Sequence, residues 1–281
     1  MSNTDSKVSK PVSFSLDGKT VEAQPGETIW QAAARHGTDI PHLCYRDSDG
    51  YRADGNCRAC MVEIEGERVL AASCIRTPSE GMVVHSDNHR AKTARKMVME
   101  LLVADQPPRA DAHDPESELW HYAETQDVGE ARFPAKAAPA PDSSHPAIAV
   151  NMDACIQCNL CVRACREVQV NDVIGLAGRG ADAHIVFDFG DDMGASTCVG
   201  CGECVQACPT GALMPKTLLD DSQALAITPD RQVDSVCPYC GVGCQLTFSV
   251  KDDKIVSVSG RQGPANAGRL CVKGRYGFDY M

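Results

Sequence analysis

The sequence of 281 residues is poor in aromatic side chains, in basic charge and in long apolar runs. Aromatic residues make up only 5% of the chain, which is few for one large hydrophobic core. The formal net charge of −11 argues against general nucleic-acid binding, because neutralising phosphates requires a basic surface. No apolar stretch approaches the length of a membrane span, and residues 1–10 lack the apolar core or twin arginine of a secretory signal. The sequence therefore predicts a cytoplasmic protein.

Cysteine is the abundant residue, with 16 in the chain. Thiols stay reduced in the cytoplasm, so these are better interpreted as metal ligands than as disulfides. The cysteines form four sets of four with none left over: Cys44, Cys57, Cys60 and Cys74; Cys155, Cys158, Cys161 and Cys165; Cys198, Cys201, Cys204 and Cys208; and Cys237, Cys240, Cys244 and Cys271. Four thiolates complete either a tetrahedral zinc site or an iron–sulfur cluster, so the spacing within each set has to distinguish the two.

The first 104 residues have the pattern of a small α+β domain. Alternating or β-branched runs predict strands over residues 12–16, 20–23, 61–64 and 68–71. Residues 29–36 predict a short helix, with Thr28 as its N-cap, and Asp17-Gly18 predicts the tight turn of the first hairpin. This order of hairpin, helix, cysteine loop and further strands resembles the β-grasp fold of [2Fe–2S] ferredoxins.

The first cysteine set has the spacing C-x12-C-x2-C-x13-C, which differs from that of plant-type [2Fe–2S] ferredoxins. The spacing resembles the N-terminal domain of the large peripheral subunit of respiratory NADH dehydrogenases. That resemblance implies a [2Fe–2S] cluster on the four cysteines, with a structural zinc ion as the alternative. His42 lies two residues before Cys44, but because the set is already complete we expect His42 to pack or face solvent rather than ligate.

A helix is predicted over residues 86–105, with Met97, Leu101 and Leu102 on one apolar face. The following segment, residues 105–150, contains no cysteine and much of the chain's acidity. Its part from 134 to 146 is rich in alanine and proline, which is typical of an exposed connector or an extended wrap over a neighbour. We therefore expect a linker here.

One metal site of the NADH-dehydrogenase relatives is missing from this linker. Those relatives carry H-x3-C-x2-C-x5-C after such a helix, which forms a histidine-ligated [4Fe–4S] site. The corresponding positions here hold Gln106, Ala110, His113 and Leu119, none of which is the expected ligand type. His113 and His121 do not replace the motif, since two imidazoles without a thiolate make a poor cluster site. We expect this cluster to be absent.

Residues 155–165 and 198–208 repeat the run C-x2-C-x2-C-x3-C at an interval of 43 positions. The doubled run is typical of bacterial two-cluster ferredoxins, in which the fourth cysteine of each run ligates the other cluster. One [4Fe–4S] cluster is therefore expected on Cys155, Cys158, Cys161 and Cys208, and a second on Cys198, Cys201, Cys204 and Cys165. Arg166 departs from the motif, in which proline follows the fourth cysteine. Residues 173–176 and 184–187 predict two strands between the runs.

The fourth set has the spacing C-x2-C-x3-C-x26-C, and a predicted hairpin of residues 245–250 and 255–259 precedes its last cysteine. This arrangement resembles the cluster-bearing N-terminal lobe of molybdopterin oxidoreductases. The resemblance implies a third [4Fe–4S] cluster on Cys237, Cys240, Cys244 and Cys271. In that family the lysine two residues after the last cysteine lies between cluster and pterin. The resemblance assigns that bridging role to Lys273, which otherwise would be interpreted as a solvated surface lysine.

The order of these sites resembles the N-terminal iron–sulfur portion of the α subunit of NAD-dependent formate dehydrogenases that contain molybdenum or tungsten. The resemblance implies one [2Fe–2S] and three [4Fe–4S] clusters, which relay electrons between a molybdopterin site and a flavin- and NAD-binding partner of the diaphorase type. The reaction would be formate oxidation or CO2 reduction, with FMN and NAD bound on that partner. The pterin-binding domains are expected C-terminal to Tyr280, as missing domains or as a separate polypeptide, so this chain alone is not expected to be catalytic.

We accordingly expect an α+β protein made of successive modules. These are a β-grasp [2Fe–2S] domain with a trailing helix in residues 1–104, the acidic linker in 105–150, a two-cluster ferredoxin domain in 151–218, and a β-rich [4Fe–4S] lobe in 233–281. One alternative is the electron-transfer subunit of an NAD-linked hydrogenase or another NADH-dehydrogenase-like complex. Such hydrogenase chains usually keep the histidine-ligated site and have no need of the set that begins at Cys237. The other alternative is a non-redox module that holds structural zinc.

Overall fold

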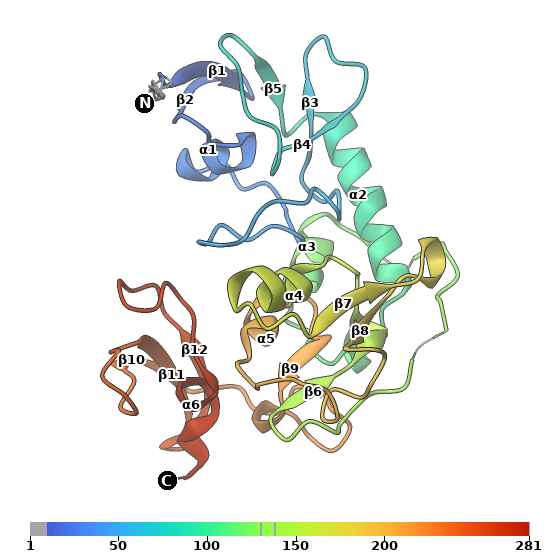
Figure 1. The fold of residues 1–281 in the computed structure, drawn as a ribbon. Helices are drawn as coiled ribbons and strands as arrows, with labels where there is room; N and C mark the ends of the chain where they lie inside the picture. Colours follow the sequence, from blue (N-terminus) through green and yellow to red (C-terminus); the bar gives the residue numbers. More distant parts are fainter. Residues whose placement is uncertain (1–9, 130, 138, 281) are drawn as a thin grey trace, which may run out of the picture.

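The computed structural model describes residues 10–129, 131–137 and 139–280. In Figure 1 a sheet lies at the top, one long helix leads downward to a central part with short helices and strands, and the C-terminal sheet and helix lie at the lower left. The mixed sheets and short helices agree with the expected α+β class. Across the described part of the chain, no helix has both the length and the apolar composition needed to cross a membrane.

The N-terminal domain, residues 10–104, is built on a five-stranded sheet with the order β2-β1-β5-β3-β4. Its strands are β1 (Val12–Leu16), β2 (Lys19–Ala23), β3 (Met61–Ile64), β4 (Ala71–Ala72) and β5 (Val83–His85). β1 and β5 are parallel, whereas the other pairs are antiparallel. Helix α1 (Ile29–Arg35) packs on this sheet, and the apolar core between them includes Phe14, Ile29 and Val62, each at most 2% exposed.

Local sequence explains the first turns of this domain. The hairpin at Asp17-Gly18 is confirmed, and both residues have positive φ (50° and 79°), as a two-residue turn between twisted strands requires. Thr28 caps α1 as predicted, since its hydroxyl accepts a hydrogen bond from the amide of Gln31 while the Gln31 side chain accepts one from the amide of Thr28. The strand predicted over residues 68–71 is wrong. Only Ala71 and Ala72 pair with β3, on the side of β3 opposite to β5.

Helix α2 (His89–Ala104) leads from this domain toward the centre of the molecule (Figure 1). It begins three residues later than predicted, after an N-cap at Asn88. The predicted apolar face is wrong for Met97 and Leu101, which are 44% and 50% exposed. Leu102 does pack against an apolar cluster, in which Met99 is completely buried. The buried face also includes Arg95, whose guanidinium donates to two backbone carbonyls. A pattern of apolar residues does not reveal a buried position that a charged side chain occupies.

Residues 105–150 are more ordered than a connector needs to be. They contain a 3₁₀ turn (Arg109–Asp111) and helix α3 (Glu118–Thr125), which packs against α2. Leu119 of α3 is completely buried in an apolar cluster with Met99 and Tyr122. Leu119 stands where the pattern of the histidine-ligated site requires a cysteine, so apolar packing replaces a metal ligand at this position.

His113 attaches this segment to the chain that follows it. The Nδ1 atom lies 2.8 Å from the carbonyl oxygen of Gln223, and Nε2 lies 3.0 Å from a carboxylate oxygen of Asp153. Because both ring nitrogens face acceptors, the arrangement favours the doubly protonated imidazolium. The hydrogen bond to Asp153 accordingly raises the pKa of His113 above its ordinary value, although burial opposes this shift.

We expect this contact to make stability depend on pH. The folded-state pKa of His113 lies above the unfolded value of about 6.5, so the stabilisation is complete below about pH 6.5 and is lost as the pH rises through the folded pKa. His113→Gln should therefore lower the free energy of unfolding by about 1–2 kcal/mol at low pH and by less at high pH. Thermal unfolding of the wild type and of His113→Gln, at pH values below and above the pKa of His113, checks the prediction. A difference in stability between the two proteins that stays constant with pH contradicts it.

The central module, residues 148–218, has two small sheets and two short helices. β6 (Ile148–Val150) pairs with β9 (Leu213–Pro215), and β7 (Ile174–Ala177) pairs with β8 (His184–Phe187). The predicted β7–β8 hairpin is confirmed to within one residue. Helix α4 (Leu160–Arg163) continues into a π-helical turn (Ala164–Val168), and α5 (Glu203–Ala207) is its shorter counterpart in the second cysteine run. These short elements surround a core that contains many of the cysteines.

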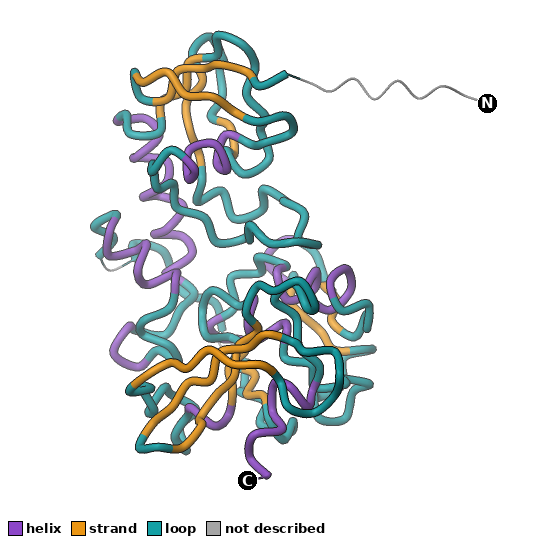
Figure 2. The backbone as a smooth tube through the Cα atoms, turned by 90° about the vertical axis from the view of Figure 1, so that its left-hand side faces the viewer, coloured by secondary structure: helices purple, strands orange, loops and turns teal. Residues whose placement is uncertain are grey.

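The C-terminal lobe, residues 231–280, is an antiparallel sheet of β10 (Arg231–Val236), β11 (Gln245–Lys251) and β12 (Lys254–Gly260), followed by α6 (Val272–Tyr276). The predicted β11–β12 hairpin is confirmed. β10 was not predicted, because nearly all of its side chains are exposed and it lacks an alternating apolar pattern. Figure 2 shows this lobe beside the central module at one end of the molecule, with the N-terminal domain at the other end.

Candidate metal centres

The loops around β3 and β4 bring the first cysteine set together. The side chains of Cys57 and Cys74 both hydrogen-bond to Cys44, and Cys74 also hydrogen-bonds to Cys60. The backbone amides of Asn56 and Cys57 donate to the Cys44 sulfur over 3.2 and 3.4 Å. Together these donors hold the pKa of the Cys44 thiol well below its ordinary value. A thiolate that accepts several hydrogen bonds is the form in which cysteine binds metal.

His42 lies beside this set but is occupied by other contacts. Its ring packs edge-on against Trp30, with the ring centroids 4.4 Å apart. Its Nδ1 atom lies 3.3 Å from the hydroxyl of Tyr122 on α3. The imidazole therefore packs between the N-terminal domain and the following segment, which agrees with the packing role expected from the sequence.

The two cysteine runs of the central module share one backbone geometry. Gln157 and Asn159 in the first run, and Gly200 and Gly202 in the second, all have positive φ between 56° and 69°. In each run the amide two residues after the first cysteine donates to the sulfur of that cysteine, over 3.4 Å in both cases. Left-handed residues at these positions turn successive amides inward, which is how a short loop surrounds an anionic group.

The fourth cysteine of each run lies with the other run. One small cavity is lined by the side chains of Cys155, Cys158, Cys161 and Cys208, together with apolar neighbours. A second cavity is lined by those of Cys165, Cys198, Cys201 and Cys204. The structure thus places together the two mixed sets of four that the doubled run predicts.

Burial perturbs the thiols of this module. It raises the pKa of Cys155 to about 11, and it also raises the pKa values of Cys158, Cys161 and Cys204 above their ordinary range. Iron bound at these positions would have to displace protons, so metal binding and folding are coupled here. Four sulfurs with inward-facing amides fit an iron–sulfur cluster, since iron binds thiolates and inorganic sulfide accepts hydrogen bonds.

The fourth set belongs to the C-terminal lobe and is the most accessible. Cys237 is buried, whereas Cys240 and Cys271 are exposed. Cys244 interacts electrostatically with all three of them. Lys273 lies two residues after Cys271 in α6, with its side chain exposed. Within the described residues, no group of three or more His, Cys, Asp or Glu side chains is arranged to hold one metal ion.

Three protein-family models match successive segments of the chain. The "2Fe-2S iron-sulfur cluster binding domain" matches residues 9–89, the "4Fe-4S dicluster domain" matches 154–212, and the "Molybdopterin oxidoreductase Fe4S4 domain" matches 230–281. The chain is an iron–sulfur protein. All four cysteine sets of this iron–sulfur protein fall inside the matched segments, and the matched domains bind both [2Fe–2S] and [4Fe–4S] clusters.

The relatives of this iron–sulfur protein carry different names. It is 33% identical over 276 residues to an "NADH-quinone oxidoreductase" chain of Rhizobium meliloti, and 24% identical over 305 residues to "Putative formate dehydrogenase SH0748" of Staphylococcus haemolyticus. The matches cover 96% and 95% of this chain but 31% of each relative. The crystal structure of an NAD+-reducing [NiFe]-hydrogenase in the H2-reduced state matches with a TM-score of 0.65 and 28% identity, covering 73% of this chain and 87% of that one.

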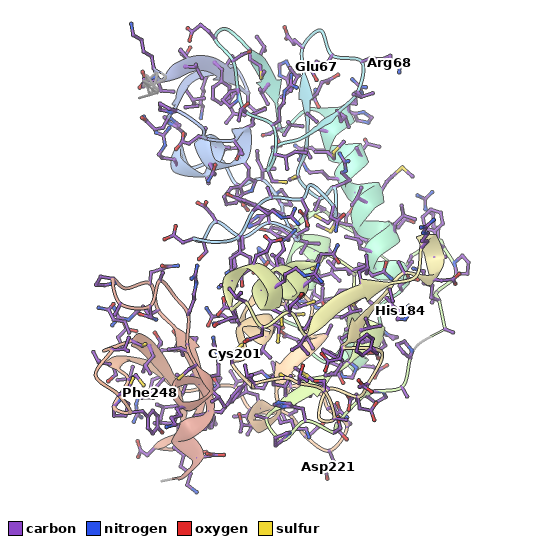
Figure 3. All side chains as sticks on the ribbon, in the orientation of Figure 1. Glu67, Arg68, His184, Cys201, Asp221 and Phe248 are labelled. Carbon is purple, nitrogen blue, oxygen red and sulfur yellow. The ribbon has the colours of Figure 1, made fainter. Side chains whose placement is uncertain are left out.

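The residues that join the cysteine-bearing parts could not be predicted from the sequence. The hydroxyl of Tyr51, from the N-terminal domain, donates to Glu203 of α5 over 2.8 Å. A Cβ atom on Gly202 would lie 2.6 Å from the hydroxyl of Tyr276, so glycine is needed where α6 approaches the second run. In Figure 3, the labelled Cys201 lies on the side of the central module that faces the C-terminal lobe. No spacing rule marks such contacts, because they join residues far apart in the chain.

Proposed function

We propose that this chain is the electron-transfer segment of an NAD-dependent formate dehydrogenase that contains molybdenum or tungsten. In this proposal Cys44, Cys57, Cys60 and Cys74 hold one [2Fe–2S] cluster. Three [4Fe–4S] clusters are held by Cys155, Cys158, Cys161 and Cys208; by Cys198, Cys201, Cys204 and Cys165; and by Cys237, Cys240, Cys244 and Cys271. The clusters supply one-electron transfer. The chain's own part is to hold them at fixed positions and to set the polarity around them.

The continuity of the cysteine sets through the molecule carries this proposal. A single buried core contains Cys44 of the first set together with Cys158, Cys161, Cys165 and Cys204 of the central module. Cys44 and Cys158 are near enough to interact electrostatically. At the other side of the module, Arg275 of the C-terminal lobe donates to the carbonyl of Cys201 over 3.1 Å. Four sites that follow one another through packed protein are the arrangement that a relay needs.

The C-terminal lobe favours formate dehydrogenase over hydrogenase. Residues 230–281 match a molybdopterin-oxidoreductase domain, for which a hydrogenase chain has no need. A relative named for formate dehydrogenase is similar over 95% of this chain. The structural similarity to an NAD+-reducing hydrogenase, over 73% of the chain, favours the alternative. Both options suit NAD as the electron acceptor, since plant-type [2Fe–2S] centres have potentials of about −400 mV.

The proposal requires two partners. A molybdopterin-bearing polypeptide, or C-terminal domains of the same protein, would meet the exposed face of the lobe around Cys271, where Lys273 would lie between cluster and pterin. A subunit that binds FMN and NAD would exchange electrons with the N-terminal domain. The proposed divisions of the chain are 1–104, 105–150, 151–218 and 233–281, with no cluster in the second.

The purified protein is expected to contain about 14 iron atoms per chain with a matching amount of labile sulfide, as one [2Fe–2S] and three [4Fe–4S] clusters require. Elemental analysis and a sulfide assay measure both quantities. About 18 iron atoms would contradict the absence of a cluster in residues 105–150. Zinc without labile sulfide would contradict the redox function altogether.

Affinity purification of the chain from its native cells tests the assembly. We expect a flavin subunit to accompany it, together with a polypeptide that holds pterin and molybdenum or tungsten, and we expect the complex to reduce NAD with formate. A complex with nickel in place of molybdenum and tungsten would support the hydrogenase alternative. A stable monomer that forms no complex would contradict both.

A further inference from the structure

Two buried arginines lie where the cluster-bearing parts meet. Arg163 of α4 is 1% exposed and Arg275 of α6 is 4% exposed. A guanidinium taken out of water is destabilising unless its charge and its N–H groups find partners. Apolar side chains of similar size could fill these two buried positions with a smaller loss of stability. The groups that Arg163 and Arg275 contact therefore indicate the function of the two arginines.

Arg163 joins the central module to the N-terminal domain. It lies in the first cysteine run, between Cys161 and Cys165, which belong to different cavities. Its Nη2 atom donates to the backbone carbonyl of Cys44 over 2.5 Å, and its Nη1 atom forms an ion pair with Asp54. One buried cation therefore connects loops that belong to three cysteine sets.

Arg275 repeats this arrangement at the other junction. Its amide donates to the carbonyl of Cys271 over 3.0 Å, which ties it to the fourth cysteine set. Its Nε atom donates to the carbonyl of Cys201 over 3.1 Å, and Nη2 lies 3.4 Å from a carboxylate oxygen of Glu203. Glu203 is itself 3% exposed. At both junctions, an arginine beside one cysteine set binds the carbonyl of a cysteine in the next set and pairs with a carboxylate.

We propose that Arg163 and Arg275 are positioning residues that hold successive iron–sulfur centres at fixed positions relative to one another and favour their reduced states. This inference rests on the proposed function, because it takes Cys44 and Cys201 as cluster ligands. A bond to the carbonyl of a ligand cysteine restrains the loop that carries the ligand. Reduction adds a negative charge to a centre, and the nearby carboxylates of Asp54 and Glu203 oppose it. Each arginine makes reduction easier because it offsets the carboxylate with which it pairs.

Variants at Arg163 separate the charge from the geometry. Arg163→Gln removes the charge and is expected to lower the reduction potential of the centre that Cys44 ligates. Arg163→Lys keeps the positive charge but loses the planar guanidinium with its several N–H donors. The reduction potential should therefore stay near that of the wild type, while amide exchange in residues 42–60 becomes faster. The double variant Arg163→Gln/Asp54→Asn removes both charges, and its potential should return toward the wild-type value.

The measurements are redox titration followed by EPR and amide hydrogen exchange, both on the iron-loaded full chain. Arg231→Gln is the matched control, since Arg231 forms an exposed ion pair with Asp253. Arg275→Gln should lower the reduction potential of the centre that Cys201 ligates. It should leave the potential of the centre that Cys44 ligates unchanged. Arg163→Gln should leave the centre of Cys271 unchanged.

The positioning role is overturned if Arg163→Gln and Arg275→Gln leave all potentials as they are in Arg231→Gln. It is also overturned if both arginine variants shift every centre alike, which would indicate a general loosening of the protein. Where a single glutamine variant fails to fold, the lysine variant and the charge-neutral double variant supply the answer. A wild-type chain without iron and labile sulfide contradicts the proposed function instead, so the two failures are distinguishable.

Discussion

Replacing Cys208 by alanine is expected to destroy the [4Fe–4S] cluster assigned to the first cysteine run. Cys208 itself belongs to the second run, which lies 43 positions further along the chain. Cys208 shares a cavity with Cys155, Cys158 and Cys161, and loss of one thiolate of four leaves that site incomplete. The cluster assigned to Cys198 and its neighbours should persist, because Cys165 supplies its fourth sulfur. EPR of the reduced protein and iron analysis are the measurements, with a loss of about four iron atoms per chain.

Cys165→Ala is the matched control for this experiment. It should produce the opposite pattern, with loss of the cluster on Cys198, Cys201 and Cys204 and retention of the other. The two variants remove the same chemical group from equivalent positions of a repeat, so a general effect on folding would affect them equally. If Cys208→Ala instead removes the cluster of its own run, the crossed assignment is wrong.

The sequence was sufficient to predict the features that depend on neighbouring residues. The Thr28 cap and the Asp17-Gly18 turn need only a few adjacent side chains, and both are present. In the central module, three cysteines of one run and the fourth of the other line each cavity, and their assignment to two clusters stays a prediction. The left-handed backbone in the first run, however, occurs at Gln157 and Asn159 rather than at glycine. Its likeness to Gly200 and Gly202 is visible only in the structure.

Features that depend on tertiary contact escaped prediction for a physical reason. Arg163 and Cys44 are far apart in the sequence, and nothing near either residue marks the bond between them. The exposed β10 has no apolar alternation, because neither of its faces is buried, and its pairing with β11 is visible only in the structure. Leu119 was recognised as unable to bind metal, yet only the packing of α3 against α2 shows that apolar contact fills the position.

Removing the clusters is expected to unfold the central module while the N-terminal sheet survives. The helices of the central module, α4 and α5, have four and five residues, which is far below the length at which a helix is stable alone. Four cysteines of the module belong to its buried core, namely Cys158, Cys161, Cys165 and Cys204, and the two sites that they help to line would lose their bonds to metal. Structural metal sites contribute about 10 kcal/mol or more, which is comparable to the whole stability of a small domain.

The N-terminal domain differs from the central module because its core consists mainly of aliphatic and aromatic side chains. Phe14, Ile29 and Val62 pack between α1 and a five-stranded sheet, and Cys60 and Cys74 are the cysteines of that core. Hydrogen exchange should therefore show that amides of β1 and β2 stay protected after iron is removed with acid and a chelator, whereas those of β7, β8 and α4 exchange freely. Protein taken through the same steps without acid or chelator is the control. Continued protection of the β7–β8 hairpin in iron-free protein would contradict the prediction, because it would show that the central module folds on its apolar contacts alone.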